Sequence, residues 1–293
     1  MSIALSQILS TPVEINNIRA NRKPPGLKDQ HLVGLLAMID LFESSATGHK
    51  LKSSKVTYFS SPTISKPSIK AKWSGAGSVN LVSQILLPSI VFSKPHDFEM
   101  VNIEIQGGTI GNWAPTYMSI VQVLMPLLEQ FGVKFEYELI KHGLFPDLIG
   151  RCILKCPPLE LPLKAVNFTE RGNLTKIDFY TVFWKGFHHF EEILKKSIED
   201  NETFNDIEIE YHSELVDIKN PKIKACTLCS ICVMRFDSGA VVYQDLLKDG
   251  KFLRSSAKFE FRRQECKISK ERSYRNYSSR YWSYWICLKK LWI

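Results

Sequence analysis

Four cationic side chains lie close together near the start of the chain, in a stretch that also contains two prolines and a glycine. They are Arg19, Arg22, Lys23 and Lys28. A guanidinium group can donate two parallel hydrogen bonds to the oxygens of one phosphate. The Pro24-Pro25-Gly26 bend restricts the loop before binding, so the loop loses less conformational entropy when it binds. Gln30 and His31 follow at the expected start of a helix, where the helix dipole favours an anion. Residues 17–31 therefore have the composition of a phosphate site, although a solvated basic loop has the same composition.

The segments around this loop predict a strand before it and an amphipathic helix after it. Residues 13–18 alternate apolar and polar side chains, and Asp29 is a suitable N-cap for the helix. Apolar side chains then recur at helical spacing as far as Phe42. A second strand, a Gly/Pro loop, a helix and a further strand follow at residues 100–139, so we interpret the two units as a weak internal repeat.

A glycine-rich turn lies between the two units and leads into another predicted helix. It consists of Gly75-Ala76-Gly77-Ser78, and backbone N–H groups at such a helix start can bind phosphate. The turn lacks the Gly-Lys-Ser/Thr ending of a P-loop and the spacing of a dinucleotide-binding motif. It therefore supports phosphate binding only in combination with the basic loop.

Three other patterns have structural as well as functional interpretations. Residues 226–232 hold three cysteines at metal-like spacing, but a fourth ligand is lacking and an apolar strand fits better. His188 and His189 lack the serine, cysteine or aspartate spacing of a catalytic triad, so we expect them to be structural. The tail after Arg262 interleaves arginine with tyrosine and tryptophan, which fits either a grip on single-stranded nucleic acid or sequence not selected to fold.

The composition is that of a folded protein, because 44% of the 293 residues are hydrophobic and 23% are charged. Residues 262–293 contain nine Lys/Arg and two Asp/Glu, so the rest of the chain contributes only +1 to the net charge of +8. The sequence contains no run of eighteen apolar residues and no secretory signal. The seven cysteines fit a reducing compartment. We therefore expect no membrane association and a nuclear (nucleoplasmic) or cytoplasmic location.

Taken together, the three loops resemble the RNA 3′-terminal phosphate cyclases. The matching segments are N-I-R-A-N-R-x-x-P-G-L-K-x-Q-H, then G-A-G-S-V-x-L-V-x-Q-x-L-L-P, then G-G-T-x-x-x-W-A-P, in that order. F-T-E-R-G at residues 168–172 and F-D-S-G-A-V-V at residues 236–242 extend the likeness. The resemblance covers about residues 4–245, and the combination is specific although each piece alone is not.

The resemblance implies an α/β (α+β) fold of repeated β-α units, each a four-stranded sheet backed by two helices, with a smaller inserted α/β domain. Residues 1–165 correspond to the core repeats, the first of them incomplete. Residues 166–245 correspond to the inserted domain. Residues 246–293 correspond to a remnant of a third repeat with an atypical basic and aromatic tail.

The resemblance also implies an activity, in which RNA 3′-phosphate ends become 2′,3′-cyclic phosphates in an ATP-dependent, AMP-forming ligase reaction of RNA processing. ATP, with Mg²⁺ or Mn²⁺, first adenylates a histidine of the enzyme. Arg19, Arg22, Gln30 and His31 match positions that hold phosphate in the family. Gln84 matches a position that contacts the nucleotide.

The sequence departs from the family pattern in three places. An E-G-G-G-Q-like segment is expected ahead of Met1, and a glycine triplet is replaced by Asp147-Leu148-Ile149-Gly150. No histidine occurs after His212, and none of the seven histidines matches the nucleophile. We therefore expect a truncated or internally deleted member that has no catalytic residue of its own for adenylation. The alternative is a non-catalytic, RNA-binding cyclase-like protein of ribosome biogenesis.

Overall fold

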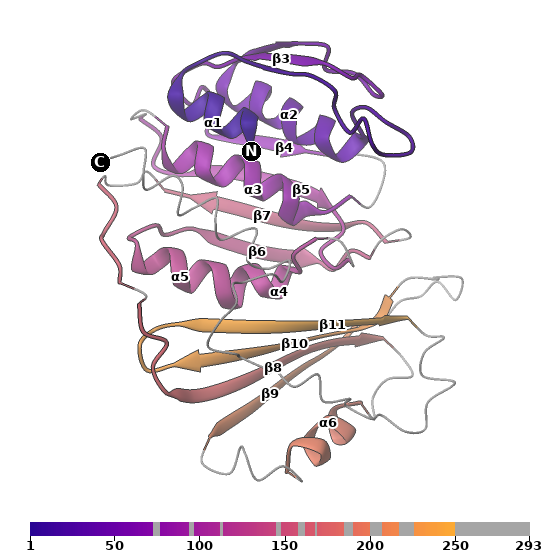
Figure 1. The fold of residues 1–293 in the computed structure, drawn as a ribbon, viewed down its shortest axis with the longest axis vertical. Coiled ribbons are helices and arrows are strands. Elements are labelled where there is room, and N and C mark those ends of the chain that lie inside the picture. Colours follow the sequence, from indigo (N-terminus) through magenta and orange to yellow (C-terminus); the bar gives the residue numbers. More distant parts are fainter. Residues whose placement is uncertain are drawn as a thin grey trace. The chain divides into compact units, whose positions relative to one another are not determined.

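Three β-sheets are formed by the residues that the structure describes (Figure 1). The structure is a computed structural model, and it describes residues 1–72, 77–93, 97–111, 114–144, 148–157, 162–167, 169–184, 190–199, 207–216 and 226–249. All of them belong to one unit, Met1–Arg254. Mixed parallel and antiparallel sheets with helices between strands confirm the expected α+β class. The domain boundaries at residues 165 and 245 stay a prediction, and Gly75, Ala76, His188, His189 and the tail lie outside the described residues.

The first sheet contains three strands in the order β1-β3-β2, all antiparallel. Its elements are α1 (Ser2–Leu9), β1 (Val13–Ile15), α2 (Asp29–Phe42), β2 (Ser45–Thr47) and β3 (Val56–Phe59). Tyr58 of β3 is fully buried, and its hydroxyl donates to Gln7 Oε1 at 2.7 Å and accepts from Ser44 at 2.8 Å. This buried network joins α1 and the end of α2 to the sheet, because a buried hydroxyl is stable only when it is hydrogen-bonded.

The second sheet contains four strands in the order β4-β5-β7-β6. Its elements are β4 (Ser68–Ala71), α3 (Val79–Val91), β5 (Val101–Gly107), α4 (Tyr117–Ser119), η1 (Ile120–Leu124), α5 (Met125–Gln130), β6 (Glu136–Lys141) and β7 (Gly150–Cys156). Alternate side chains of β5 and β7 are buried, as expected for a sheet with one face covered. Helix α3 packs against both of these strands (Figure 1).

The first two sheets follow the same order of elements over part of their length. In each, a strand, a helical segment and two further strands occur in sequence, and the third of these strands lies between the other two. This correspondence agrees with the weak repeat suggested by the sequence. The finer expectation of four strands and two helices in every unit stays a prediction, because the first sheet has three strands in the described residues.

The predicted helix over residues 118–130 is interrupted by a π-helical turn, η1. Pro126 explains the interruption, because it has no N–H to donate to the carbonyl of Gln122, four residues earlier. The two helical pieces therefore cannot share one regular hydrogen-bond pattern.

The third sheet has the strand order β11-β10-β8-β9. Its elements are β8 (Leu174–Trp184), α6 (Phe190–Glu199), β9 (Glu208–Val216), β10 (Cys226–Phe236) and β11 (Val241–Asp249). The cysteine run lies in β10, which confirms the strand interpretation. Cys229 and Cys232 are three residues apart and so point to opposite faces of the strand, where they cannot share one metal ion.

No helix within the described ranges has both the length and the apolar character needed to cross a membrane.

Candidate phosphate-binding site

The basic loop is held in shape by backbone hydrogen bonds to the connection between β2 and β3. The N–H of Ile18 donates to Ser54 O and that of Leu27 donates to Ser53 O, both at 2.9 Å, while Lys52 N–H donates to Leu27 O at 2.8 Å. Within the loop, the N–H of Gly26 donates to Ile18 O at 2.9 Å. The loop is therefore fixed by a partner segment that local sequence patterns do not indicate.

Arg19 braces this loop from inside. Its backbone has a φ of +52°, and its Nη1 donates to Pro24 O at 2.8 Å and to Gly26 O at 3.0 Å. The side chain is partly buried, and its Nε and Nη2 make no hydrogen bond with any other described residue. Arg19 therefore shapes the loop and still has donors available for an anion.

Arg22 has a different position from Arg19. Its backbone N–H donates to Arg19 O at 2.9 Å, which places it one turn further along the loop, and the residue is exposed. Lys23 and Lys28 are also exposed. No aspartate or glutamate occurs between Ile15 and Lys28, so the loop contains no carboxylate that would neutralise these cations.

Helix α2 begins one residue earlier than expected. Lys28 is its N-cap and Asp29 its first residue, so the prediction of Asp29 as N-cap is wrong. A lysine side chain has no acceptor, and the N–H groups of Asp29 and Gln30 make no hydrogen bond within the described part of the chain. Two N–H groups at the N-terminus of α2 therefore lack an acceptor among the described residues, and the carboxylate of Asp29 lies in the same turn.

Gln30 connects this helix end to the start of α3. Its Oε1 accepts from Ser78 N–H at 3.1 Å, and the N–H of Val79 donates to Gly108 O at 3.0 Å. The end of the basic stretch at Gln30, the start of α3 at Ser78 and the third loop of the resemblance (residues 107–115) therefore meet. The same bonds occupy the N–H groups of Ser78 and Val79, so this described part of the glycine-rich turn is a junction and not an open phosphate cradle.

A buried hydrogen-bond network holds the third loop to α3. Tyr137 donates to Asn80 Oδ1 at 2.9 Å and accepts from Ser83 at 3.0 Å, and Asn80 Nδ2 donates to Pro115 O at 2.6 Å. Burial raises the pKa of Tyr137 well above 10, so its phenol remains protonated and continues to donate. This network makes α3 and the third loop a rigid support for the α2 end.

His31 lies in the first turn of α2, next to the cationic loop. His31 is exposed, but neighbouring protein atoms reduce the hydration of the imidazole and lower its pKa below the usual 6.5, and the positive charges of Arg19 and Lys28 lower it further. At neutral pH His31 is therefore uncharged and can donate or accept one hydrogen bond. Of the predicted phosphate-binding residues, His31 and Arg19 are close enough to interact electrostatically.

Gln84 lies further along α3 than the junction residue Ser78 and is partly buried. Within the described residues its side chain makes no hydrogen bond with Arg19, Arg22, Gln30 or His31. Its contact with a nucleotide stays a prediction.

A buried histidine that no sequence pattern indicated lies beside the third loop. His142 is 4% exposed, with Nδ1 at 3.2 Å from Thr109 Oγ1 and Nε2 at 3.2 Å from Glu214 Oε2. Thr109 Oγ1 also accepts from Gly143 N–H at 3.1 Å. This series of contacts links the third loop to β9. In the sequence, His142 stands in a K-H-G segment, and no local pattern identifies Thr109 or Glu214 as its partners.

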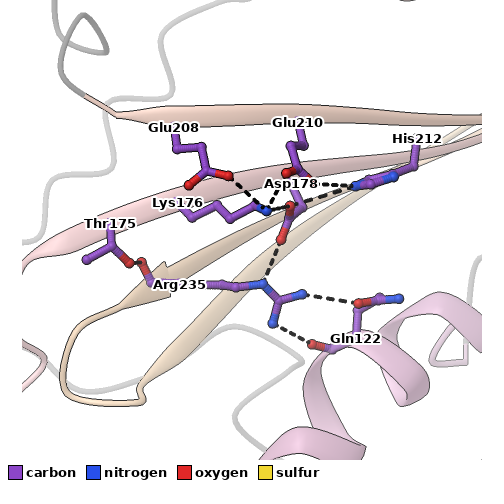
Figure 2. Close-up of polar contacts among 8 residues, drawn as sticks. All are labelled: Gln122, Thr175, Lys176, Asp178, Glu208, Glu210, His212 and Arg235. Atoms are coloured by element: carbon purple, nitrogen blue, oxygen red, sulfur yellow. Dashed lines mark hydrogen bonds and ion pairs between the residues drawn. The ribbon is translucent and has the colours of Figure 1, made fainter.

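An ion network covers one face of the third sheet (Figure 2). Asp178 is 2% exposed and accepts from Arg235 Nε at 2.6 Å, while Arg235 Nη2 donates to Gln122 Oε1 at 3.1 Å. Asp178, Glu210 and His212 are close enough to share a cation. However, Lys176 Nζ already lies 2.7 Å from Glu210 and 3.5 Å from Asp178. The lysine supplies the positive charge here, so these residues do not fit a divalent metal.

The structure thus defines an α+β protein in which an uncapped helix end and a basic loop form a candidate anion site. Comparison with known proteins agrees with this description. The family described as RNA 3′-terminal phosphate cyclase matches residues 1–268, so the chain belongs to that family.

Curated proteins from archaea and eukaryotes are similar to this chain. An RNA 3′-terminal phosphate cyclase of Pyrobaculum aerophilum is 37% identical over 176 residues, which is 60% of this chain and 49% of the relative. A probable RNA 3′-terminal phosphate cyclase of Dictyostelium discoideum is 34% identical over 184 residues, 62% of this chain and 42% of the relative. An RNA 3′-terminal phosphate cyclase of Drosophila melanogaster is 35% identical over 159 residues, covering 54% and 42%. The chain spans about half the length of the curated relatives it matches.

We predict that Gly26→Ala destabilises the basic loop. Gly26 has a φ of +84°, and an added Cβ would lie 2.3 Å from Lys52 O, which is shorter than any normal contact. The free energy of unfolding should fall by roughly 1–3 kcal/mol, measured by urea denaturation.

Gly111→Ala is the matched control for this prediction. It lies in another loop, and no heavy atom lies within 4 Å of the added Cβ. We expect its effect on the free energy of unfolding to stay within about 0.5 kcal/mol. Equal effects of the two substitutions would contradict the assigned loop geometry.

We also predict that an anion changes the titration of His31. In the free chain its imidazole should titrate below 6.5, and inorganic phosphate should raise that pKa because a nearby negative charge favours the imidazolium ion. The free chain should also lose stability as the pH falls below about 6.5, since the unfolded state then binds more protons. NMR titration of the His31 ring protons, assigned with His31→Gln, tests this. A pKa that phosphate leaves unchanged would exclude His31 from the site.

Proposed function

We propose that this chain binds the terminal phosphate of an RNA 3′-end and takes part in its conversion to a 2′,3′-cyclic phosphate. The observation that carries the proposal is the start of α2, where the N–H groups of Asp29 and Gln30 have no acceptor among the described residues and where His31 interacts with the charge of Arg19. Family membership supplies the reaction class. RNA processing with an ATP-dependent ligase mechanism follows from that class.

The chemistry assigned to these residues is charge neutralisation and positioning, which dominate phosphoryl transfer. Arg22 and the N–H groups at the start of α2 bind the phosphate oxygens, and Arg19 maintains the loop and adds positive charge. His31 contributes a hydrogen bond and takes up a proton when its pKa rises beside the anion. A phosphate held in this way is oriented so that the neighbouring 2′-hydroxyl can attack phosphorus.

The nucleotide part of the reaction is not assigned to described residues. In the family, ATP supplies the adenylate that leaves when the ring closes. Gln84 is the one matched nucleotide position, the N–H groups of Ser78 and Val79 are bound to protein acceptors, and Lys176 neutralises the carboxylates that could attract a divalent ion. The nuclear or cytoplasmic location stays a prediction.

The first prediction from this proposal concerns the RNA end. RNA with a 3′-phosphate should bind more tightly than the same RNA with a 3′-hydroxyl, and Arg22→Ala should remove most of that preference. The loss should be about tenfold or more, since a hydrogen bond to a charged group contributes roughly 1.5–3 kcal/mol. Fluorescence anisotropy at several salt concentrations measures both ligands.

Arg151→Ala provides the control for the RNA-end measurement. Arg151 is an exposed arginine of β7, 3.8 Å from Glu104, and belongs neither to the basic loop nor to the start of α2. We expect it to leave the preference for the 3′-phosphate unchanged. Equal binding of both RNA ends by the unmodified chain would contradict the proposed site.

The second prediction concerns adenylation. The 293-residue polypeptide should form no stable protein–AMP adduct with radiolabelled ATP, because none of its histidines matches the family nucleophile. Gel electrophoresis after incubation, beside an adenylating cyclase as positive control, measures this. A labelled band that acid removes and alkali does not would show a phosphoramidate adduct and refute the prediction.

A further inference from the structure

A second cationic segment lies in the connection between β2 and β3. Residues 48–55 read G-H-K-L-K-S-S-K, and all four basic side chains are exposed. They are His49, Lys50, Lys52 and Lys55. The sequence contains no aspartate or glutamate between Ser44 and His96. This segment therefore carries positive charge without a neighbouring acidic residue in the chain.

The structure joins this segment directly to the basic loop. Backbone hydrogen bonds connect Ile18 with Ser54 and Leu27 with both Lys52 and Ser53. Gly26 approaches the backbone of Lys52 so closely that even a methyl group would not fit. The cations of residues 19–28 and 49–55 consequently belong to one continuous surface, which we call the cationic surface.

Residues 48–55, which connect the antiparallel strands β2 and β3, form the hairpin part of this surface. Most of their positive charge is not neutralised by acidic side chains of the protein. Lys55 forms an ion pair with Glu14 at 2.8 Å. Lys50 and Lys52 form no ion pair with any residue that the structure describes. Lys66, which lies beyond this segment, is by contrast paired with Asp40 at 2.6 Å. Keeping like charges together without counter-ions opposes folding, so their arrangement fits the binding of an external polyanion.

We propose that the cationic surface binds the backbone phosphates of the nucleotides that precede the RNA 3′-end. This inference rests on the proposed function, because the terminal phosphate at the α2 end fixes where the strand begins. Flexible lysines suit a single-stranded backbone, which carries one phosphate for each nucleotide and which they bind without reading the bases. The chain therefore selects long RNA over short RNA by charge.

The apolar content of the surface favours RNA over a lipid bilayer as the partner. Leu51, at 50% exposure, is the one large apolar side chain exposed in residues 16–28 and 48–55. Segments that lie in a membrane interface need a broader apolar face beside their lysines. The continuity with the phosphate site also gives the RNA strand a defined direction.

The decisive variant is Lys50→Gln together with Lys52→Gln, tested with two 3′-phosphorylated ligands. One is a mononucleotide 3′-phosphate and the other an RNA of about ten nucleotides, a length within single-strand site sizes. Binding of the longer RNA should weaken roughly 10- to 25-fold at about 0.1 M salt, with the salt slope reduced by about 1.4 for two lost phosphate contacts. Binding of the mononucleotide should not change.

Lys134→Gln together with Lys164→Gln is the matched control. Both lysines are exposed and lie outside the two segments of the cationic surface. This double variant should bind both ligands as the unmodified chain does. Circular dichroism and thermal unfolding establish that the two double variants remain folded.

Two outcomes would overturn the inference. In one, the hairpin variant binds both ligands as tightly as the unmodified chain, or weakens both equally. In the other, the control variant loses as much affinity for the longer RNA, which would mean a diffuse effect of net charge. The same measurements on 3′-hydroxyl RNA keep the inference separate from the proposed function. If the longer RNA still loses affinity in the hairpin variant but RNA with a 3′-phosphate binds no more tightly than RNA with a 3′-hydroxyl, the proposed terminal-phosphate site is refuted and the cationic surface is not.

Discussion

The hydrogen bond from Ser78 N–H to Gln30 Oε1 is the constraint on which the candidate site depends. Backbone donors at a helix start must find acceptors, and α3 finds them in α2 and in the loop after β5. One glutamine therefore sets the position of α2 against α3 and, through Gly108, against the third loop. The two helices therefore differ: the N–H groups of Ser78 and Val79 at the start of α3 have protein acceptors, whereas those of Asp29 and Gln30 at the start of α2 have none among the described residues.

The basic loop meets a second constraint, because it concentrates charge on backbone that few residues adopt. Arg19 has a positive φ without being glycine, and Gly26 fits against Lys52 only because it has no side chain. The protein compensates with the hydrogen bonds that Arg19 makes inside the loop and with those to residues 52–54. Local stability is therefore lost to a shape that concentrates four cations in residues 19–28, directly before the carboxylate of Asp29. A role in binding explains this cost, and packing does not.

Elements with a periodic pattern of apolar residues could be predicted from the sequence. Contacts between residues far apart in the chain could not. The stripe that ends at Phe42 predicted α2, and residues 226–232 were correctly interpreted as a strand. The α2 start was misplaced by one residue because both Lys28 and Asp29 can precede a helix. The partners of His142 were not predictable, since Glu214 lies 72 residues away and no local pattern connects them. The hairpin lysines were missed for the same reason, because only the folded chain brings Lys52 beside Leu27.

Within the described residues, an apolar cluster and the polar contacts of Glu214, Arg235 and Gly239 tie the third sheet to the second sheet and its helices. Glu214 contacts His142, which lies against Thr109 of the third loop. Arg235 reaches Gln122 in the π-helical turn, where Pro126 has already disturbed the helical hydrogen bonds. The apolar cluster consists of Ile110, Leu144, Val182 and Cys229. Because Ile110 directly follows Thr109, apolar and polar contacts fix the same short segment. The contacts of the third sheet with Thr109 and Ile110 therefore support the third loop, whose Gly108 O accepts the N–H of Val79 at the start of α3.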